Sequence, residues 1–347
     1  MAAVLQERSA LVLTLRDLEL PLAAEGVTEL CINRPGEGFV ESFRGWQQVP
    51  LAFASYEWCL RLCKLVANAT AQRIDEQSPL LSAALPGGER IQLAMPPATP
   101  AHTVSITIRK PAPQNWSLAE LAQMGIFART QHSGRSADPC REQLLALLEQ
   151  SDYVGFMRMA VVTRQNILVS GPTGSGKTTW TKALIREIPA HERLISIEDA
   201  QELVLDRHPN HVRLFYSKGG QGRSTVTPKQ LLEACLRMKP DRILLAELRA
   251  EEAFDYLRNA NSGHPGSITS VHAASADLAF EQLVLLVKQN AAGREMSRAD
   301  IRQLLGTLVD IVIQFGVEGH RRYIKEIWYG PARIHPVTTL AMDDAHA

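Results

Sequence analysis

The residues best suited to chemistry form a glycine-rich stretch from Gly171 to Thr178, with the sequence GPTGSGKT. A strand-like run, residues 166–170, precedes this stretch, and residues 179–185 continue it with a helical pattern. A strand, the pattern G-x-x-x-x-G-K-[ST] and a helix, in this order, are typical of a phosphate-binding loop. The glycines let successive backbone N–H groups face a polyphosphate, and the helix N-terminus adds partial positive charge. The stretch therefore predicts binding of a nucleoside triphosphate.

Individual residues of this loop have distinct predicted roles. Lys177 is placed to reach the β- and γ-phosphates, and the Thr178 hydroxyl is placed to hold Mg²⁺. The residues predicted to bind ATP are Gly171, Pro172, Thr173, Gly174, Ser175, Gly176, Lys177, Thr178 and Thr179. A purely structural glycine turn is disfavoured, because a strand and a helix flank the pattern.

Glu247 is the first candidate for activating water. It follows the apolar run 243–246 directly, as the acidic end of a Walker B strand does. Ala246 occupies the position where many P-loop enzymes carry a metal-associated Asp. We therefore predict that Glu247 both polarises water and binds Mg²⁺, directly or through water. A plain carboxylate at a strand end is the competing interpretation.

Other polar groups also follow apolar runs. Glu198 and Asp199 come after 194–197, and Glu198 is a second candidate base, whereas Asp199 has the alternative of capping a helix. His272 ends the run 267–271, which makes it a candidate donor to the γ-phosphate. His264 lies in a glycine-rich stretch nearby, and a lone histidine is more often structural than catalytic.

Composition bounds the class of protein. At 347 residues, 45% of them hydrophobic, the chain is long enough for two domains with separate cores. Its 37 Lys and Arg residues balance its 37 Asp and Glu residues, so charge alone does not predict nucleic-acid binding. No apolar run approaches the roughly 18 residues of a membrane span.

The cysteines indicate a reducing compartment. They are Cys31, Cys59, Cys63, Cys140 and Cys235, and no two form a C-x-x-C pair. Cys59 and Cys63 would share one face of a helix, where filling the core is the preferred interpretation. An odd number of cysteines without a secretory signal predicts a cytoplasmic protein, which can still attach to a membrane complex.

Residues 1–110 are predicted to form a smaller α+β domain. It has strand patterns at 26–33, 89–94 and 104–109 and a helical pattern over 53–74. Pro111, Pro113 and the polar stretch 129–141 predict a linker over 111–141, which carries a short helix at 118–124.

Residues 142–347 are predicted to form the larger domain. Strand patterns at 166–170, 194–197, 243–246 and 267–271 alternate with helical patterns that include 141–160 and 230–238. This alternation favours a mostly parallel sheet with helices on both faces and ligands at the carboxyl ends of its strands. The phosphate loop, Glu198, Glu247 and His272 all follow such ends.

Three stretches that follow the loop resemble the motifs of the secretion ATPase superfamily. They are 197–199 (IED), 240–249 (PDRILLAELR) and 262–273 (SGHPGSITSVHA), which are similar to the Asp box, the Walker B motif and the His box. In that superfamily these motifs follow a Walker A motif in the same order. The closest resemblance is to the traffic ATPase of bacterial type IV secretion systems. Ala246 is a mild departure, because the family commonly has Gly there.

The resemblance implies a RecA-like C-terminal domain, an N-terminal domain stacked on it, and a homo-hexameric ring with ATP between the two domains. It also implies that Arg90 and Arg109 lie near the phosphates as catalytic groups. Their alternative is ion pairing at the surface or within a sheet. The polar stretch 129–141 departs from the family pattern and leaves the connection between the domains open.

The function implied by the resemblance is a Mg²⁺-dependent ATPase at the cytoplasmic face of the bacterial inner membrane. It would power type IV secretion, conjugative transfer or pilus assembly, with inner-membrane channel components and other secretion ATPases as partners. A type II secretion or pilus ATPase is one alternative, although those enzymes usually carry a four-cysteine zinc insertion that this sequence lacks. A nucleic-acid translocase is a second alternative, disfavoured by the neutral charge, and no sequence-specific binding of nucleic acid is expected. A nucleotide-gated scaffold without hydrolysis is a third.

Overall fold

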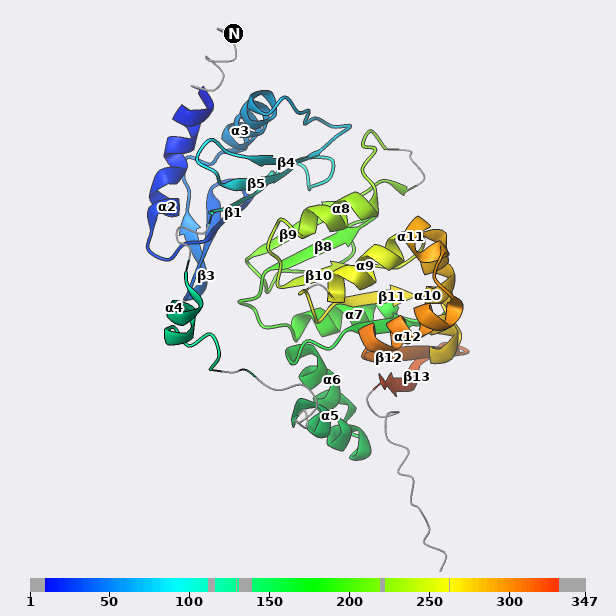
Figure 1. Cartoon of the computed structure of the whole chain (residues 1–347). Helices are drawn as coiled ribbons and strands as arrows, with labels where there is room; N and C mark the ends of the chain where they lie inside the picture. The colour runs from blue at the N-terminus through cyan, green and yellow to red at the C-terminus, as the bar shows by residue number, and fades with distance from the viewer. Residues whose placement is uncertain are drawn as a thin grey trace, which may run out of the picture.

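The computed structural model describes residues 10–111, 116–128, 130, 139–218, 222–261 and 263–330. The outer parts of the two predicted domains, residues 1–9 and 331–347, lie outside these ranges. The described residues form two sheet-bearing lobes that lie side by side in Figure 1. Residues 10–111 are termed the N-terminal lobe and residues 139–330 the C-terminal lobe. The predicted α/β class is confirmed.

The N-terminal lobe is built on a six-stranded antiparallel sheet. Its strands are β1 (Glu29–Arg34), β2 (Glu37–Ser42), β3 (Gly45–Pro50), β4 (Leu80–Ala84), β5 (Arg90–Ala94) and β6 (Ser105–Arg109), in the order β3-β2-β1-β6-β5-β4. The three strands predicted from the sequence are β1, β5 and β6. Strand β3 is largely exposed, so it lacks the apolar alternation that reveals a half-buried strand.

Helix α3 (Tyr56–Ala69) packs against this sheet, after the short helices η1 (Arg16–Leu18) and α2 (Glu19–Ala23). It begins after Ser55, whose hydroxyl accepts a hydrogen bond from Trp58 N at 3.2 Å, as an N-cap does. Cys59 and Cys63 lie on its buried face, where burial raises the pKa of both thiols to about 12. Their predicted place in the core is confirmed, and both are free thiols.

The C-terminal lobe contains two sheets. Its strands are β7 (Ile167–Ser170), β8 (Leu194–Glu198), β9 (His211–Phe215), β10 (Arg242–Leu245), β11 (Ile268–Val271), β12 (Ile311–Glu318) and β13 (Arg321–Tyr329). Their orders are β10-β8-β9 and β11-β7-β12-β13. All pairs are parallel except the hairpin β12–β13, so the predicted parallel arrangement is confirmed, in two sheets instead of one.

Helices cover both faces of these sheets (Figure 1). They are α5 (Pro139–Glu149), α6 (Tyr153–Val162), α7 (Lys177–Arg186), α8 (Pro228–Cys235), α9 (Glu252–Asn261), α10 (Ala276–Gln289), α11 (Ala291–Arg294) and α12 (Arg298–Leu308). In β10, Ile243 and Leu245 join one apolar cluster and Leu244 joins another. After Arg242, the residues of this strand are therefore apolar on both faces, as residues of buried parallel strands commonly are.

The helical pattern over 141–160 forms two helices, α5 and α6, instead of the single helix predicted. The chain turns at Ser151, whose φ of 57° is left-handed, and Asp152 then caps α6 by accepting a hydrogen bond from Gly155 N at 2.9 Å. An Asp at this position favours a new helix start over continuation of the first helix.

The predicted linker contains helix α4 (Leu118–Gln123), close to the expected 118–124. Ser117 and Glu120 form a capping box at its start. The other linker residues at 112–115, 129 and 131–138 lie outside the described ranges. Within the described ranges, none of the helices has the length and apolar character needed to cross a membrane.

The two lobes share a polar contact that is centred on Arg193. Its side chain is fully buried, and Nη1 donates to Oδ1 of Asn33 in the N-terminal lobe at 2.8 Å. The same nitrogen donates to Asn210, whose Oδ1 also accepts from Asn33 Nδ2 at 2.9 Å. A buried guanidinium needs such acceptors, because an unpartnered one is costly to remove from water. The lobes are therefore held together by a specific hydrogen-bond network.

Candidate nucleotide site

The glycine-rich loop follows β7 and leads directly into α7. Gly176 is the N-cap of α7 and has a φ of 95°, which side chains disfavour. A Cβ atom on Gly171 would lie 2.7 Å from Cβ of Phe315 in β12 and 2.8 Å from Oγ of Ser175. Glycine is thus required at one position by conformation and at the other by close packing.

Lys177 is buried at the centre of the loop. Its ammonium donates to the backbone oxygens of Gly171 at 2.8 Å and Pro172 at 3.1 Å, and it lies 3.1 Å from Nδ1 of His272. Burial lowers the pKa of Lys177, while the carboxylate of Glu247 acts in the opposite direction. The ammonium is therefore held where the loop meets the ends of the neighbouring strands.

A cavity of about 410 Å³ opens in front of the loop. Its lining residues from the loop are Thr173, Gly174, Ser175, Gly176, Lys177, Thr178 and Thr179, and those from elsewhere are Asp199, Glu202, Ala246, Glu247, Arg249, Ser270, His272 and Arg322. The structure thus places two distant predicted residues, Glu247 and His272, beside the loop.

Both oxygens of Glu247 are held by neighbouring side chains. His272 Nε2 lies 3.0 Å from Oε1, and Arg249 Nη2 lies 2.6 Å from Oε2. Nη1 of Arg249 donates to Asp199, and hydrogen bonding to Glu247 is the main cause that raises the pKa of Arg249 above its ordinary value. Lys177, His272, Glu247, Arg249 and Asp199 therefore form a continuous chain of polar contacts along the cavity wall.

Glu198 lies outside this cavity, although the sequence offers it as a base. The side chain is fully buried, and its oxygens accept from the Ser196 hydroxyl at 2.6 Å and from Arg213 Nη2 at 3.0 Å. Its Oε2 also accepts from the backbone N–H groups of Glu202 and Leu203, each at 2.8 Å. Both oxygens of Glu198 are therefore occupied by protein donors, which indicates a structural carboxylate.

Asp199 caps no helix, because residues 199–205 are irregular. Its carboxylate instead pairs with Arg249 and lies 3.8 Å from the ammonium of Lys218. Asp199 thus belongs to the cavity, and the helix-capping alternative is wrong.

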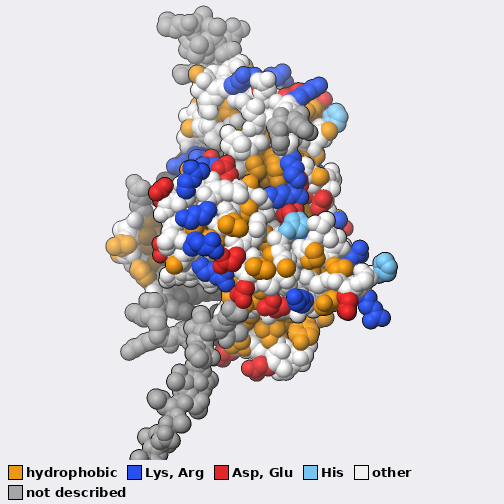
Figure 2. All heavy atoms as spheres, turned by 90° about the vertical axis from the view of Figure 1, so that its right-hand side faces the viewer, with side chains coloured by type: hydrophobic (Ala, Val, Ile, Leu, Met, Phe, Trp, Pro, Cys, Tyr) orange, Lys and Arg blue, Asp and Glu red, His pale blue; other side chains and the backbone are white. Residues whose placement is uncertain are grey.

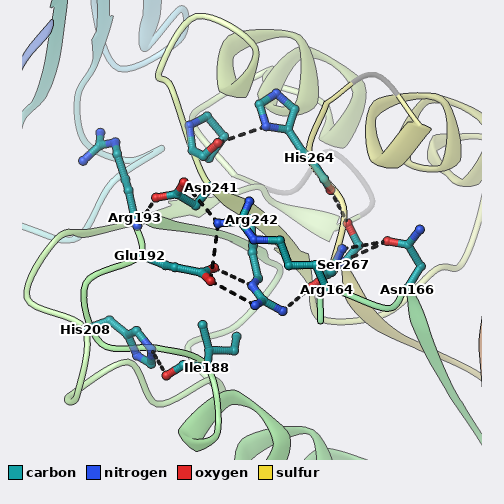
Figure 3. Close-up of polar contacts among 12 residues, drawn as sticks. Arg164, Asn166, Ile188, Glu192, Arg193, His208, Asp241, Arg242, His264 and Ser267 are labelled. Carbon is teal, nitrogen blue, oxygen red and sulfur yellow. Dashed lines mark hydrogen bonds and ion pairs between the residues drawn. The ribbon is translucent and has the colours of Figure 1, made fainter. Parts of the chain in front are cut away.

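His264 lies at the opposite edge of the sheets, where β10 and β11 begin (Figure 3). Its Nδ1 lies 2.9 Å from the backbone oxygen of Pro240, and burial lowers its pKa. Nearby, Arg242 is fully buried and pairs with Glu192 at 2.6 Å. These contacts tie the starts of the strands together, so the structural interpretation of His264 is the one that the geometry favours.

The profile of the family described as "Type II/IV secretion system protein" matches residues 20–314. The chain belongs to this family. It is 45% identical over 338 residues to a type IV secretion system protein VirB11 of Bartonella quintana, covering 94% of each chain. It is 48% identical over 310 residues to VirB11 of Brucella suis, covering 88% of this chain and 86% of the relative.

A solved structure supports the same family assignment. The crystal structure of the VirB11 ATPase from the Brucella suis type IV secretion system, in complex with sulphate, superposes with a TM-score of 0.90 at 45% identity. The match covers 96% of this chain and 98% of the solved one. The predicted resemblance to type IV secretion traffic ATPases is confirmed.

In this secretion ATPase, Arg90 and Arg109 lie away from the loop. They line a separate cavity of about 340 Å³ together with Arg237. Arg109 pairs with Glu29 on the neighbouring strand. This contact is the ion pair within a sheet that the sequence left as the alternative to a catalytic role. Arg90 faces Arg109 directly across β5 and β6. Within one chain, neither arginine reaches the cavity that Lys177 lines.

The residues at the loop fit a phosphate and a hard cation. Ser175 Oγ is buried, lines the cavity and has no hydrogen-bond partner among the described residues, so it can donate to a phosphate oxygen. Thr178 is exposed in the cavity. The described residues contain no group of three or more His, Cys, Asp or Glu side chains that could hold a metal alone. Mg²⁺ is commonly bound in such sites by one or two protein groups and the substrate phosphates.

Neither Arg322 nor the role of Arg249 was predicted from the sequence. Arg249 stands in the Walker B-like stretch, and its charge two residues after Glu247 was a usable signal. Arg322 comes from the hairpin β12–β13, which the pattern analysis did not identify. Only the pairing of β12 with β7 brings that hairpin to the loop.

Proposed function

We propose that this chain is a Mg²⁺-dependent ATP hydrolase that drives transport through a type IV secretion system. The observation that carries the proposal is the meeting of Lys177, His272 and Glu247 at the mouth of the glycine-rich loop. Close relatives named as type IV secretion proteins, one of them solved as an ATPase, support the same conclusion.

We infer a RecA-like P-loop domain over 142–347, an N-terminal domain over 1–110 and a linker over 111–141. Parallel pairing of β7 with β11 and β12, and a loop that joins β7 to α7, support the first of these. The assembly proposed is a homo-hexamer at the cytoplasmic face of the inner membrane, in contact with channel components and other secretion ATPases.

The loop would bind the polyphosphate through its backbone N–H groups and the N-terminus of α7. Lys177 would exchange its bonds to the oxygens of Gly171 and Pro172 for bonds to the β- and γ-phosphates. Thr178 would hold Mg²⁺, which, when bound, neutralises charge on the phosphate oxygens. Ser175 supplies a further hydroxyl donor within the same cavity.

Glu247 would orient the attacking water and accept its proton. The water oxygen attacks the γ-phosphorus, the bond to the bridging oxygen breaks, and ADP leaves with the electron pair. His272, which lies between Lys177 and Glu247, is placed to donate to the γ-phosphate. We infer that Glu247, and not Glu198, is the base, because Glu247 lines the cavity whereas Glu198 is fully buried outside it.

Arg90 and Arg109 would act on the nucleotide of a neighbouring chain. They stand opposite each other on one face of the sheet, and Glu29 is the carboxylate that pairs with Arg109. Two opposite guanidinium groups that share one carboxylate leave an excess positive charge. This charge makes the juxtaposition of the two arginines unfavourable unless an anion binds nearby. A polyphosphate on the next subunit is such an anion.

The nucleic-acid translocase alternative has less support. Lys and Arg side chains are interspersed with Asp and Glu side chains on the face drawn in Figure 2, and the whole chain has a formal net charge of zero. Binding to nucleic acid is dominated by neutralisation of phosphates, which needs an excess of basic groups. Stimulation of ATP turnover by DNA that falls steeply with salt would support this alternative.

The test of the proposed function is ATP turnover by Lys177→Ala and Lys177→Gln. We expect turnover to fall by a factor of at least about 10³, because stabilisation of the phosphates is lost. Lys182→Ala is the matched control, since Lys182 lies on the same helix and does not line the cavity. Wild-type turnover by a folded Lys177 variant would contradict the assignment of the loop.

A further inference from the structure

Arg322 lies at the cavity, and the residues that the structure describes include no charge partner for it. It is exposed, it comes from β13 near the tip of the hairpin, and no described carboxylate forms an ion pair with its guanidinium. A Cβ atom placed on Gly176 would lie 3.6 Å from Cδ of Arg322, so the side chain passes beside the N-cap of α7. This N-cap is the point where the loop concentrates its backbone donors.

The other basic side chains that line the cavity, Lys177 and Arg249, already have hydrogen-bond or ion-pair partners. The ammonium of Lys177 bonds to two backbone oxygens of the loop, and Arg249 bridges the carboxylates of Glu247 and Asp199. Arg322 is thus the guanidinium at the cavity that stays available for an anion, among the residues that the structure describes.

The strand order separates Arg322 from the hydrolytic residues. Strand β7 leads into the loop, and β11, which precedes His272, pairs with it on one side. Strand β12 pairs with β7 on the other side, and β13, which carries Arg322, lies beyond β12. His272 and Arg322 therefore face the loop from opposite sides.

The position of the hairpin is fixed by contacts to the loop region. Phe315 in β12 packs against Trp180 of α7 with ring centroids 6.0 Å apart. The side chain of Gln314 donates to the backbone oxygen of Ala273, just after His272, at 3.1 Å. Because β12 is anchored on both sides of the loop, Arg322 is held beside the cavity by the fold.

We propose that Arg322 binds the α-phosphate and nucleoside end of the bound nucleotide. This inference rests on the proposed function, in which Lys177, His272 and Glu247 hold the γ-phosphate end. With the γ-phosphate on that side, the polyphosphate must run along the loop, and its α-phosphate emerges toward β12 and β13. A guanidinium suits this place, because it can bond to phosphate oxygens and stack on a purine.

A contact to the α-phosphate end has a distinct kinetic signature. ATP and ADP share this end, so the contact is equally strong in the ground state and the transition state. Interactions of this kind change KM and leave kcat unaltered. A contact to the γ-phosphate, in contrast, would lower kcat and spare the binding of ADP.

The test compares Arg322→Ala with Arg321→Ala in the full-length chain. The two arginines are adjacent on β13, so their side chains point to opposite faces, and Arg321 does not line the cavity. We expect Arg322→Ala to weaken ADP and ATP binding by the same factor, about tenfold or more, since a charge-assisted contact is lost. We expect kcat to stay within about twofold and the inhibition constant of pyrophosphate to be unchanged. Arg321→Ala should bind ADP as the wild-type chain does.

Two results would overturn the inference. Wild-type affinity for ADP in Arg322→Ala would show that the guanidinium does not touch the nucleotide. A lower kcat with unchanged ADP affinity would place Arg322 on the γ-phosphate instead. Failure of the proposed function gives a different result, because the wild-type chain would then bind no ADP at all.

Discussion

Nη2 of Arg249 lies 2.6 Å from Oε2 of Glu247, while Nη1 of the same guanidinium donates to Asp199. His272 contacts the other oxygen of Glu247 at 3.0 Å. The carboxylate that we assign as the base is therefore fixed in one orientation by its neighbours. Arg249 is a positioning residue in this arrangement, because it acts on the reaction through Glu247.

Replacing Arg249 by Ala should lower kcat by at least about tenfold, because the carboxylate loses its fixed orientation. The Kd for ADP should change by less than about twofold, since the contact to Glu247 is remote from the α- and β-phosphates. Asp199→Asn is the matched control, which removes charge at the other end of the guanidinium and keeps the pair with Glu247. Single-turnover hydrolysis and ADP titration give the two quantities. An unchanged kcat in Arg249→Ala would show that Glu247 needs no such support.

Glu247→Gln and Glu198→Gln should fail in different ways. Glu247→Gln should bind ATP but hydrolyse it about 10²- to 10⁴-fold more slowly, because the amide cannot take a proton from water. Glu198→Gln should lower the free energy of unfolding by about 3 kcal/mol, because the half-buried Arg213 loses the charge of its fully buried partner. Thermal unfolding and ATP turnover of both variants separate the two roles. Slow turnover in a stable Glu198→Gln protein would reassign the base.

Arg90 and Arg109 should act on a neighbouring chain. Arg109→Ala is expected to weaken hydrolysis more than ATP binding, since an arginine near the γ-phosphate matters most as charge develops. Mixing Lys177→Ala chains with Arg109→Ala chains should raise the activity above that of either variant alone, because some sites then receive an intact loop and an intact arginine. The measurement is ATP turnover of the mixture against each variant alone. No recovery in a mixed oligomer of confirmed composition would argue for a site within one chain.

The contact between the lobes should weaken in acid through His211. Nδ1 of this histidine lies 2.7 Å from the backbone oxygen of His208, and Nε2 lies 3.3 Å from Nη1 of Arg34 in the N-terminal lobe. Burial is the main cause that lowers the pKa of His211 from 6.5 to about 4, and Arg34 acts in the same direction. The unfolded chain thus binds the proton more readily than the folded chain between pH 6.5 and 4. Stability present above pH 6.5 is therefore lost as the pH falls through this range.

The measurement is the free energy of unfolding at pH 7 and pH 5 for wild type and His211→Gln. Glutamine does not titrate in this range. The free energy of unfolding of His211→Gln should therefore fall less between pH 7 and pH 5 than that of the wild type, by on the order of 1 kcal/mol. Comparing the two proteins removes the contribution of other histidines, such as His208 and His264, whose pKa values are also lowered. Equal losses in both proteins would show that His211 does not titrate against folding.

The glycine-rich loop, and the place of Glu247 and His272 beside it, follow from the sequence alone. The loop is a contiguous pattern whose residues meet because they are neighbours in the chain, so no tertiary information is needed. Glu247 and His272 are 25 residues apart in the chain, and each directly follows a predicted strand. Because the carboxyl ends of parallel strands lie at one edge of a sheet, both side chains are expected at that edge. The α/β class and the core positions of Cys59 and Cys63 likewise depend on local periodicity.

Only the tertiary structure decided which groups at that edge enter the cavity. Strand β8 is buried on both faces, so its apolar pattern carries no signal for which of Glu198 and Asp199 turns inward. The ion pair of Arg109 with Glu29 joins residues that are 80 positions apart in the chain. The approach of Arg322 to Gly176 joins residues that are 146 positions apart. Such contacts are set by how whole sheets pack, and a local pattern of residues cannot encode them.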